Sequence, residues 1–135
     1  IHSNGRVGSM VEIACETDFV SRNDEFKNFA REIAMQIAAS NPLYLRPEDV
    51  PAEVKEKEAQ IYREEMESQG KLKGKTDEMI EKILEGKLQK FYADACLMEQ
   101  PSIKDEELTI KDMVAAATAK IGEKIEIKRF VRFSL

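Results

Sequence analysis

Two side chains near the start of the chain, Cys15 and His2, are of the types that form a nucleophile and its base. A thiol is activated when an adjacent imidazole takes its proton, and a hairpin over residues 1–15 could bring the two side chains together. The alternative, which the sequence favours, is a small buried thiol beside a surface histidine. The sequence therefore gives little support for catalysis by this pair.

No catalytic or metal-binding motif accompanies this pair. The chain has no glycine-rich phosphate loop, no GxSxG and no HExxH. Cys15 and Cys96 lack CxxC spacing, and His2 is the only histidine, so we expect no metal site. The carboxylates stand at helical spacing beside lysines and arginines, which is typical of surface ion pairs. We expect no covalent chemistry and no cofactor.

The segment CETDFVSRNDEF, Cys15–Phe26, differs from its surroundings. It joins a predicted strand to a predicted helix, where loops on a rigid scaffold often carry function. It places a large aromatic, Phe19, beside Asp18 and outside both predicted elements. Two interpretations stay open. Phe19 contacts another molecule, or Thr17 or Asp18 caps a helical turn while Phe19 packs into the protein's own core.

Clear patterns flank this segment. Val7–Cys15 is rich in apolar residues, and together with the Asn4-Gly5 pair it predicts an antiparallel hairpin. A helix is predicted after a cap at Ser21 or Asn23, and it stops at Ser40-Asn41-Pro42. Its apolar stripe at helical spacing consists of Phe26, Phe29, Ala30, Ile33, Ala34, Ile37 and Ala38. Such a stripe is expected to lie on the apolar face of the hairpin.

Two further helices are predicted beyond a proline-rich connector. Residues 51–69 are highly charged with a thin apolar seam, which is typical of a helix that projects from the body of a protein. Three lysines in the loop at 70–75 are interpreted as solvated. A helix that starts at Thr76 or Asp77 lies antiparallel to the first, so that residues of about 51–100 form a protruding helical hairpin.

The last predicted elements are a helix and a strand. Thr109 and Asp112 have the spacing of a capping box, and Gly122 closes the helix. In the final strand, one face is predicted to carry Ile125, Ile127, Val131 and Phe133. Strands at both ends of the chain are joined most simply in a three-stranded antiparallel sheet, with the order β-β-α-β and helices on one face. This is an α+β fold, and its small uncovered sheet favours a homodimer.

Composition limits the kinds of partner. A chain of 135 residues, 35% of them charged, predicts one domain over residues 1–135. The net charge is −5 and no block of Lys or Arg stands out, so direct nucleic-acid binding is not expected. No apolar run is long enough to cross a membrane, and the isolated thiols favour the cytoplasm. Because Ile1 stands inside a predicted strand, we expect an N-terminal portion to precede it.

The order of these segments resembles the elongation factor Ts family. CETDFVSRNDEF resembles the family's signature, which is Thr-Asp-Phe-Val followed by a small and a basic residue. IHSNGRVGSMV resembles its first hairpin, FAREIAMQIAASNPLYL its first core helix, and EKILEGKLQKFYADACLMEQPSIKD its later core. Nothing here resembles the family's small N-terminal helical domain. Only one copy of the core is present, whereas some members carry two, and Ser21 stands where the family often has Ala.

This resemblance implies a guanine nucleotide exchange factor that promotes GDP release from elongation factor Tu. In such a factor Phe19 is a wedge between helices of the partner, and Asp18 accepts hydrogen bonds at its surface. The loop that approaches the partner's magnesium site is then Thr17, Asp18, Phe19 and Val20, with Arg22 and Asn23 as flanking contacts. The alternative is a dimerisation module without exchange activity of its own. The short forms of the family pair as homodimers through this core.

Overall fold

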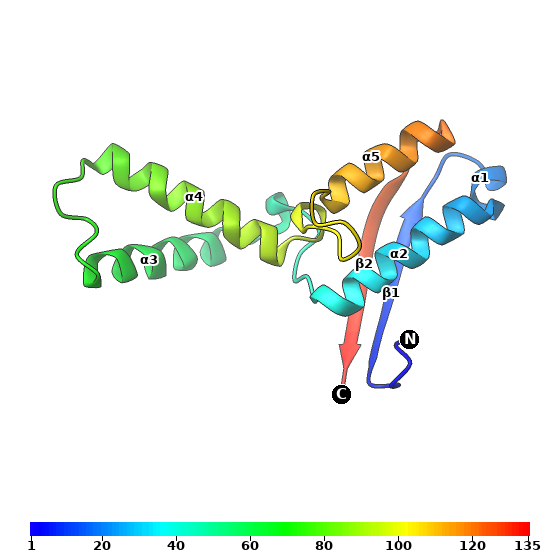
Figure 1. The fold of residues 1–135 in the computed structure, drawn as a ribbon, viewed down its shortest axis with the longest axis horizontal. Helices are drawn as coiled ribbons and strands as arrows, with labels where there is room; N and C mark the ends of the chain where they lie inside the picture. Colours follow the sequence, from blue (N-terminus) through cyan, green and yellow to red (C-terminus); the bar gives the residue numbers. More distant parts are fainter.

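The first and last strands of the chain pair in a two-stranded antiparallel sheet, and helices lie between them in the sequence. The computed structural model describes all of residues 1–135. Strand β1 (Val7–Ala14) lies beside β2 (Glu126–Ser134), as Figure 1 shows. The helices are α1 (Asp18–Arg22), α2 (Asp24–Ser40), α3 (Ala52–Ser68), α4 (Asp77–Ala95) and α5 (Ile110–Ile121), with 3-10 turns at Pro47–Asp49 and Leu97–Glu99. This is the expected mixture of helices and an antiparallel sheet.

The sheet has two strands in place of the predicted three. The expected turn at Asn4-Gly5 is present, because the backbone N–H of His2 donates to the carbonyl of Val7 at 2.9 Å and Gly5 has a φ of 67°. Apart from this turn, β1 has strand pairing with β2 alone. One edge of β1 therefore has no neighbouring strand.

A β-bulge in β2 decides which of its side chains face the helices. The register between the strands shifts at Lys128, which has no partner on β1. One extra residue exchanges the two faces of a strand. Ile127 is buried before the bulge, and Phe130 packs against the same core after it. The predicted single apolar face is therefore divided, and Val131 and Phe133 are exposed on the outer face.

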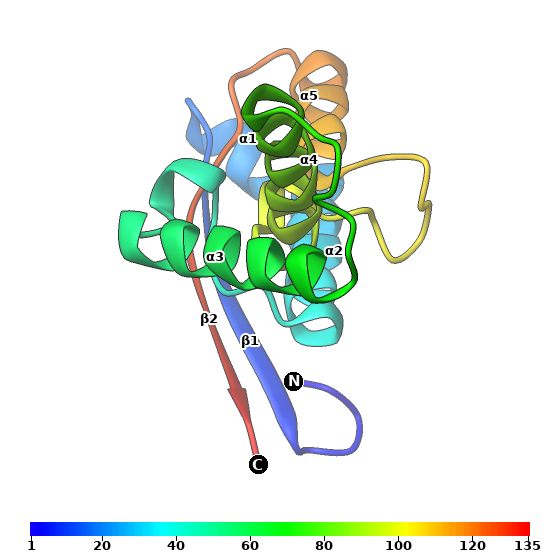
Figure 2. The same ribbon diagram turned by 90° about the vertical axis from the view of Figure 1, so that its left-hand side faces the viewer.

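Helix α2 covers the inner face of the sheet (Figure 2). Two polar contacts hold it there: the hydroxyl of Ser9 donates to the carbonyl of Ala34 at 2.7 Å, and Nε of Arg132 donates to the carbonyl of Ala38 at 3.0 Å. The helix ends at Asn41, which has a φ of 49°. The buried core beneath it consists of Val20, Phe26, Phe29, Ile33, Ile37, Leu97, Ile110, Ile125 and Ile127. The predicted stripe of α2 is confirmed.

Helices α3 and α4 form a hairpin that protrudes from this body (Figure 1). The side-chain oxygen of Thr76 caps α4 by accepting a hydrogen bond from the N–H of Met79 at 3.3 Å. The hairpin has a separate small core of Met66, Ile80 and Leu84. The protein therefore has two hydrophobic clusters, one under α2 and one inside the hairpin.

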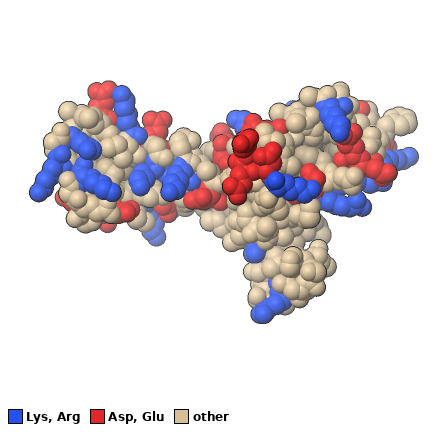
Figure 3. Space-filling view, viewed as in Figure 1, with Lys and Arg blue, Asp and Glu red and all other residues tan.

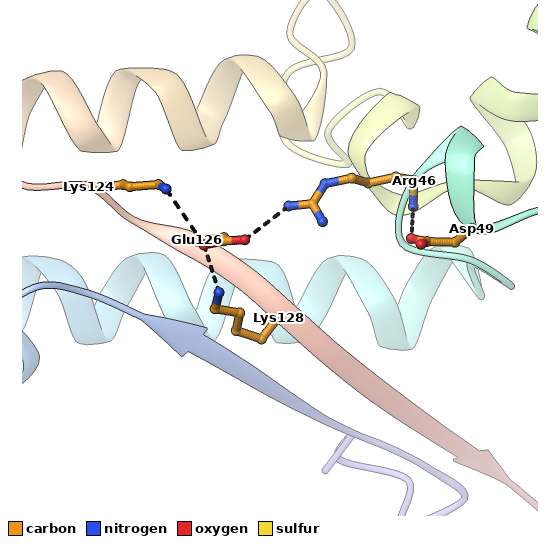
Figure 4. A network of polar contacts seen from close by, with 5 residues as sticks. All are labelled: Arg46, Asp49, Lys124, Glu126 and Lys128. Carbon is orange, nitrogen blue, oxygen red and sulfur yellow. Dashed lines mark hydrogen bonds and ion pairs between the residues drawn. The ribbon is translucent and has the colours of Figure 1, made fainter.

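Glu126, the first residue of β2, gathers three cations near the base of the hairpin (Figure 4). Nζ of Lys128 lies 2.8 Å from its carboxylate, the guanidinium of Arg46 lies at 3.7 Å and Nζ of Lys124 at 4.0 Å. The hydrogen bond from Lys128, with the neighbouring charges, lowers the pKa of the Glu126 carboxyl. The backbone N–H of Arg46 also donates to Asp49 at 3.0 Å. The connector before α3 is thus tied to β2.

Candidate functional site

The segment around Phe19 forms a short helix, α1, directly after β1. Thr17 is its N-cap residue, with φ −131° and ψ 155°, and Asp18, Phe19 and Val20 begin the helix. The prediction placed Phe19 and Asp18 outside regular structure, and here the structure differs. It agrees with the interpretation in which a helical turn starts at Thr17. The side chain of Thr17 makes no capping hydrogen bond to its own helix.

The adjacent side chains of Phe19 and Val20 in α1 differ sharply in burial. The side chain of Phe19 is 87% exposed, whereas Val20 is 8% exposed and belongs to the main core. A helix has 3.6 residues per turn, so one buried position turns the preceding side chain well away from the core. The interpretation in which Phe19 packs into the protein's own core is therefore wrong. Val20 holds α1 on the body of the protein, and Phe19 projects from it.

Glu123 holds the start of α1 from the opposite end of the sequence. The backbone N–H of Thr17 donates to Oε2 of Glu123 at 3.1 Å, and the Thr17 hydroxyl donates to Oε1 at 2.7 Å. The thiol of Cys15 donates to the carbonyl of Thr17 at 3.4 Å. Thr17 is thereby bonded through its N–H, its hydroxyl and its carbonyl. The position of α1 is defined at its first residue.

Helix α5 places Glu123 beside Thr17. The predicted capping box is confirmed, because Thr109 accepts from the N–H of Asp112 at 3.2 Å and Asp112 accepts from the N–H of Thr109 at 3.0 Å. Gly122 ends the helix with a φ of 80°, a left-handed conformation that suits glycine. The ion pair between Lys120 and Glu25 joins the last turn of α5 to the first turn of α2. The charge and hydrogen bond of Glu25 raise the pKa of Lys120.

Asn23 joins α1 to α2 and is shared by both helices. Its backbone N–H donates to the carbonyl of Val20 at 3.0 Å, and its side-chain oxygen accepts from the N–H of Glu25 at 2.8 Å. Ser21 donates from its hydroxyl to the carbonyl of Asp18 at 2.9 Å. Asp18, Arg22 and Asn23 are exposed, as Phe19 is. The loop therefore presents one large apolar side chain among polar ones on a well-bonded turn.

The family model described as Elongation factor TS matches residues 1–135, which is the whole chain. The chain belongs to the elongation factor Ts family. Its relatives include "Elongation factor Ts" of Carboxydothermus hydrogenoformans, which is 56% identical over 135 residues, covering 100% of this chain and 60% of that protein. The protein of the same name from Desulfosudis oleivorans is 50% identical over 135 residues, covering 100% of this chain and 66% of that protein. A relative from Thermoanaerobacter sp. is 53% identical over 133 residues, with 98% and 63% covered. The chain spans 60% to 66% of the length of these relatives.

The segment Thr17–Val20 divides into residues that hold it on the protein and residues that project from it. Thr17 donates two hydrogen bonds to Glu123, and Val20 packs in the main core. Asp18 and Phe19 are exposed. Glu123 was not found by sequence reasoning, because its contact with Thr17 spans 106 positions and only Gly122, a helix-ending glycine, marks its neighbourhood.

The structure does not bring Cys15 and His2 together. His2 precedes β1 and Cys15 follows it, so the eight residues of that strand separate them by about 26 Å. Cys96 is fully buried, and burial raises the pKa of its thiol to about 11. No group of three His, Cys, Asp or Glu side chains is placed to hold a metal ion. None of the helices combines the length and apolar composition needed to cross a membrane.

Proposed function

We propose that this chain carries the nucleotide-exchange surface of an elongation factor Ts and promotes GDP release from elongation factor Tu. The observation that carries the proposal is the exposure of Phe19, 87%, directly before the buried Val20. The ring of Phe19 is therefore free to contact another molecule, while the adjacent Val20 holds α1 on the core. A partner that buries it provides the reason for its position.

In the proposed mechanism Phe19 enters an apolar gap between helices of elongation factor Tu, close to the magnesium site of that partner. Asp18 accepts hydrogen bonds at the partner's surface, and Arg22 and Asn23 make flanking contacts. Movement of the partner's helices disturbs the ligands of its magnesium ion. The diphosphate of GDP then loses its counterion, and the nucleotide leaves.

The energy available from one aromatic side chain is of the right size for this role. Burial of a phenylalanine stabilises a complex by ~1.5–3 kcal/mol. Coupling between two ligands of one protein is typically ~1–3 kcal/mol, which corresponds to a change in affinity of up to ~150-fold. The contacts of Thr17 and Val20 within the chain also support the proposal, because a loop held in place loses little conformational freedom when it binds.

No covalent step is part of this mechanism. The chain accelerates release of a nucleotide by binding a second protein, and GDP leaves unchanged. A role in translation elongation places the protein in the cytoplasm.

A second proposal concerns assembly, and the outer face of the sheet supports it. Met10 and Phe133 are 72% and 71% exposed there, and Val131 lies between them on the same face. Three apolar side chains on one face of a two-stranded ribbon form a surface that a second copy can cover. We propose that the chain forms a homodimer through this face. The same face supports the alternative role of a dimerisation module without exchange activity.

Release of a fluorescent GDP analogue from elongation factor Tu tests the exchange proposal. The chain is expected to accelerate release, and Phe19→Ala to remove most of the acceleration. Leu43→Ala is the control, since Leu43 is also a large exposed apolar residue, at 64%, and lies outside α1. Equal release with Phe19→Ala and with the unchanged chain would contradict the wedge. Sedimentation velocity of Phe133→Asp tests the homodimer separately.

A further inference from the structure

The far end of the helical hairpin is a structured turn. Helix α3 ends with two hydrogen bonds, from the N–H of Gly70 to the carbonyl of Glu67 at 3.0 Å and from the N–H of Lys71 to the carbonyl of Met66 at 2.9 Å. With a φ of 68° at Gly70, these bonds form a Schellman motif. Leu72 packs against the small core of the hairpin. The turn is therefore held by its own backbone and by one apolar anchor.

Lysines on both sides of that anchor are left in solvent. Lys71, Lys73 and Lys75 are exposed, whereas Leu72 between the first two is partly buried. None of the three has a carboxylate within 4.0 Å. Elsewhere in the chain, ion pairs engage Lys27, Lys82, Lys104, Lys120, Lys124 and Lys128. The three lysines of the turn are thus exposed and make no direct ion pair, although Glu67 precedes them and Asp77 follows them in the sequence.

A fourth lysine, Lys87, joins them from α4. Lys71, Lys75 and Lys87 line one hollow of about 250 Å³ between α3, the turn and α4. The carboxylate in this hollow is that of Glu65, which accepts a hydrogen bond from Nε2 of Gln69 at 3.2 Å. In Figure 3 basic side chains gather over this end of the hairpin, at the left of the view. We call Lys71, Lys73, Lys75 and Lys87 the basic tip.

We propose that the basic tip binds the phosphate backbone of RNA without reading its sequence. Ammonium groups on flexible stems are suited to phosphates, whose charges need no fixed geometry. The apolar side chains Met66 and Leu72 pack into the hairpin core, and Met79 in the first turn of α4 is the large apolar side chain exposed beside the tip, at 52%. Lysine is also depleted from protein–protein interfaces. Tyr62, the aromatic of this core, lies under Lys87 at 5.8 Å and is not a stacking platform for bases.

A helix dipole alone does not account for the tip. Lysines near the last turn of α3 interact favourably with its carbonyl end, but that effect fades within one turn and does not require Lys73 and Lys75. The sequence predicted solvated lysines at 70–75 and no nucleic-acid footprint, since the net charge is −5 and no block of Lys or Arg stands out. The fold brings Lys87 to the turn. The choice of RNA among polyanions rests on the proposed role in translation.

Fluorescence anisotropy of a labelled, mixed-sequence RNA hairpin tests this inference with the full chain. Three to four phosphate contacts predict that affinity falls ~20–150-fold between 50 and 200 mM salt. We expect the combined Lys71→Gln, Lys73→Gln and Lys75→Gln variant to lose this salt-dependent binding. The matched control combines Arg6→Gln, Lys57→Gln and Lys111→Gln, three exposed residues without ion pairs; it changes the net charge equally away from the turn and is expected to bind as the unchanged chain does.

The inference is overturned by no RNA binding at low salt, by an equal loss in the tip variant and the control, or by tighter binding to polyglutamate or phosphatidylglycerol vesicles than to RNA. GDP release from elongation factor Tu is measured in parallel without RNA. The tip variant is expected to retain it. Loss of exchange with unchanged RNA binding overturns the role of the tip and leaves the proposed function standing. Circular dichroism checks that both variants keep their helices.

Discussion

Glu123 accepts two hydrogen bonds from Thr17, although 106 positions separate them in the sequence. This contact ties α1, which carries Phe19, to the end of α5. We predict that Glu123→Ala slows GDP release from elongation factor Tu, because α1 is then held less firmly and Phe19 must lose more conformational freedom when it binds. Loss of the pair of bonds is expected to lower the free energy of unfolding by about 2 kcal/mol. Stopped-flow release of a fluorescent GDP analogue and urea denaturation measure the two effects.

Glu16→Ala is the control for this experiment. Glu16 is exposed, stands beside Thr17 in the sequence, and takes part in no side-chain hydrogen bond or ion pair. It is expected to leave both release and stability unchanged. If Glu123→Ala exchanges nucleotide as fast as the unchanged chain does, the contact with Thr17 is structural only and does not position Phe19.

Phe19 and Val20 are predicted to respond oppositely to truncation. Phe19→Ala removes an exposed ring and should change the free energy of unfolding by less than ~0.5 kcal/mol. Val20→Ala empties a place in the main core and should cost about 1.5–3 kcal/mol. Urea denaturation of the two variants gives the comparison. A loss of stability in Phe19→Ala as large as that in Val20→Ala would show that the ring packs inside the protein.

Local sequence patterns were sufficient for most of the helices. The stripe of α2, the capping box of Thr109 and Asp112, and the helix end at Gly122 each depend on residues a few positions apart. The protruding hairpin was also predicted, because α3 is too polar to bury more than a narrow seam. These features are encoded within single elements, where spacing alone defines which side chains share a face.

Other features depend on how separate elements meet. The bulge at Lys128 exchanges the faces of β2, and strand alternation cannot reveal it without the register against β1. The contact between Glu123 and Thr17 needs α5 and α1 in place. Phe19 is exposed because Val20 packs in the core. The sequence pattern did not indicate which of these two adjacent apolar residues would be buried. The candidate site was therefore located from sequence, while its orientation required the fold.

The capping box of α5 should make stability depend on acid pH. Hydrogen bonds from the backbone N–H and hydroxyl of Thr109 lower the pKa of Asp112 below its ordinary value of 3.8. A lowered folded-state pKa means that the unfolded chain takes up the proton first as the pH falls. The contribution of Asp112 is therefore complete well above pH 3.8 and is lost as the pH falls through the lowered folded value.

Asp112→Asn tests this dependence, since the amide resembles the protonated acid. The unchanged chain is expected to be more stable than Asp112→Asn at neutral pH, and the difference should vanish in acid. Thermal unfolding from pH 7 to pH 2 measures it. Asp105→Asn serves as the control, because Asp105 is another exposed acid that accepts from a backbone N–H, that of Glu107 at 3.1 Å, outside α5. A stability difference for Asp112→Asn that stays constant down to the lowest pH would exclude a charge-dependent cap.

The two hydrophobic clusters are predicted to lose protection separately. Leu84 belongs to the hairpin core and Ile33 to the main core. Leu84→Ala should lower the stability of the packing between α3 and α4 by ~2–5 kcal/mol, because it removes side-chain volume from the hairpin core alone. Because a helix of this length is marginal without packing, the hairpin should open locally while the body stays folded. Ile33→Ala should instead lower protection everywhere, since the hairpin depends on the body that anchors its base.

Native-state hydrogen exchange distinguishes these cases residue by residue. In Leu84→Ala, amides of α3 and α4 should exchange faster, and those of α2 should keep their rates. If α2 loses protection to the same extent, the clusters unfold as one cooperative unit, and the ties of Arg46 and Asp49 at the hairpin base transmit the defect. GDP release by Leu84→Ala tests whether exchange needs the intact hairpin. Retained exchange with an opened hairpin is expected, because Phe19, Glu123 and Val20 all belong to the body of the protein.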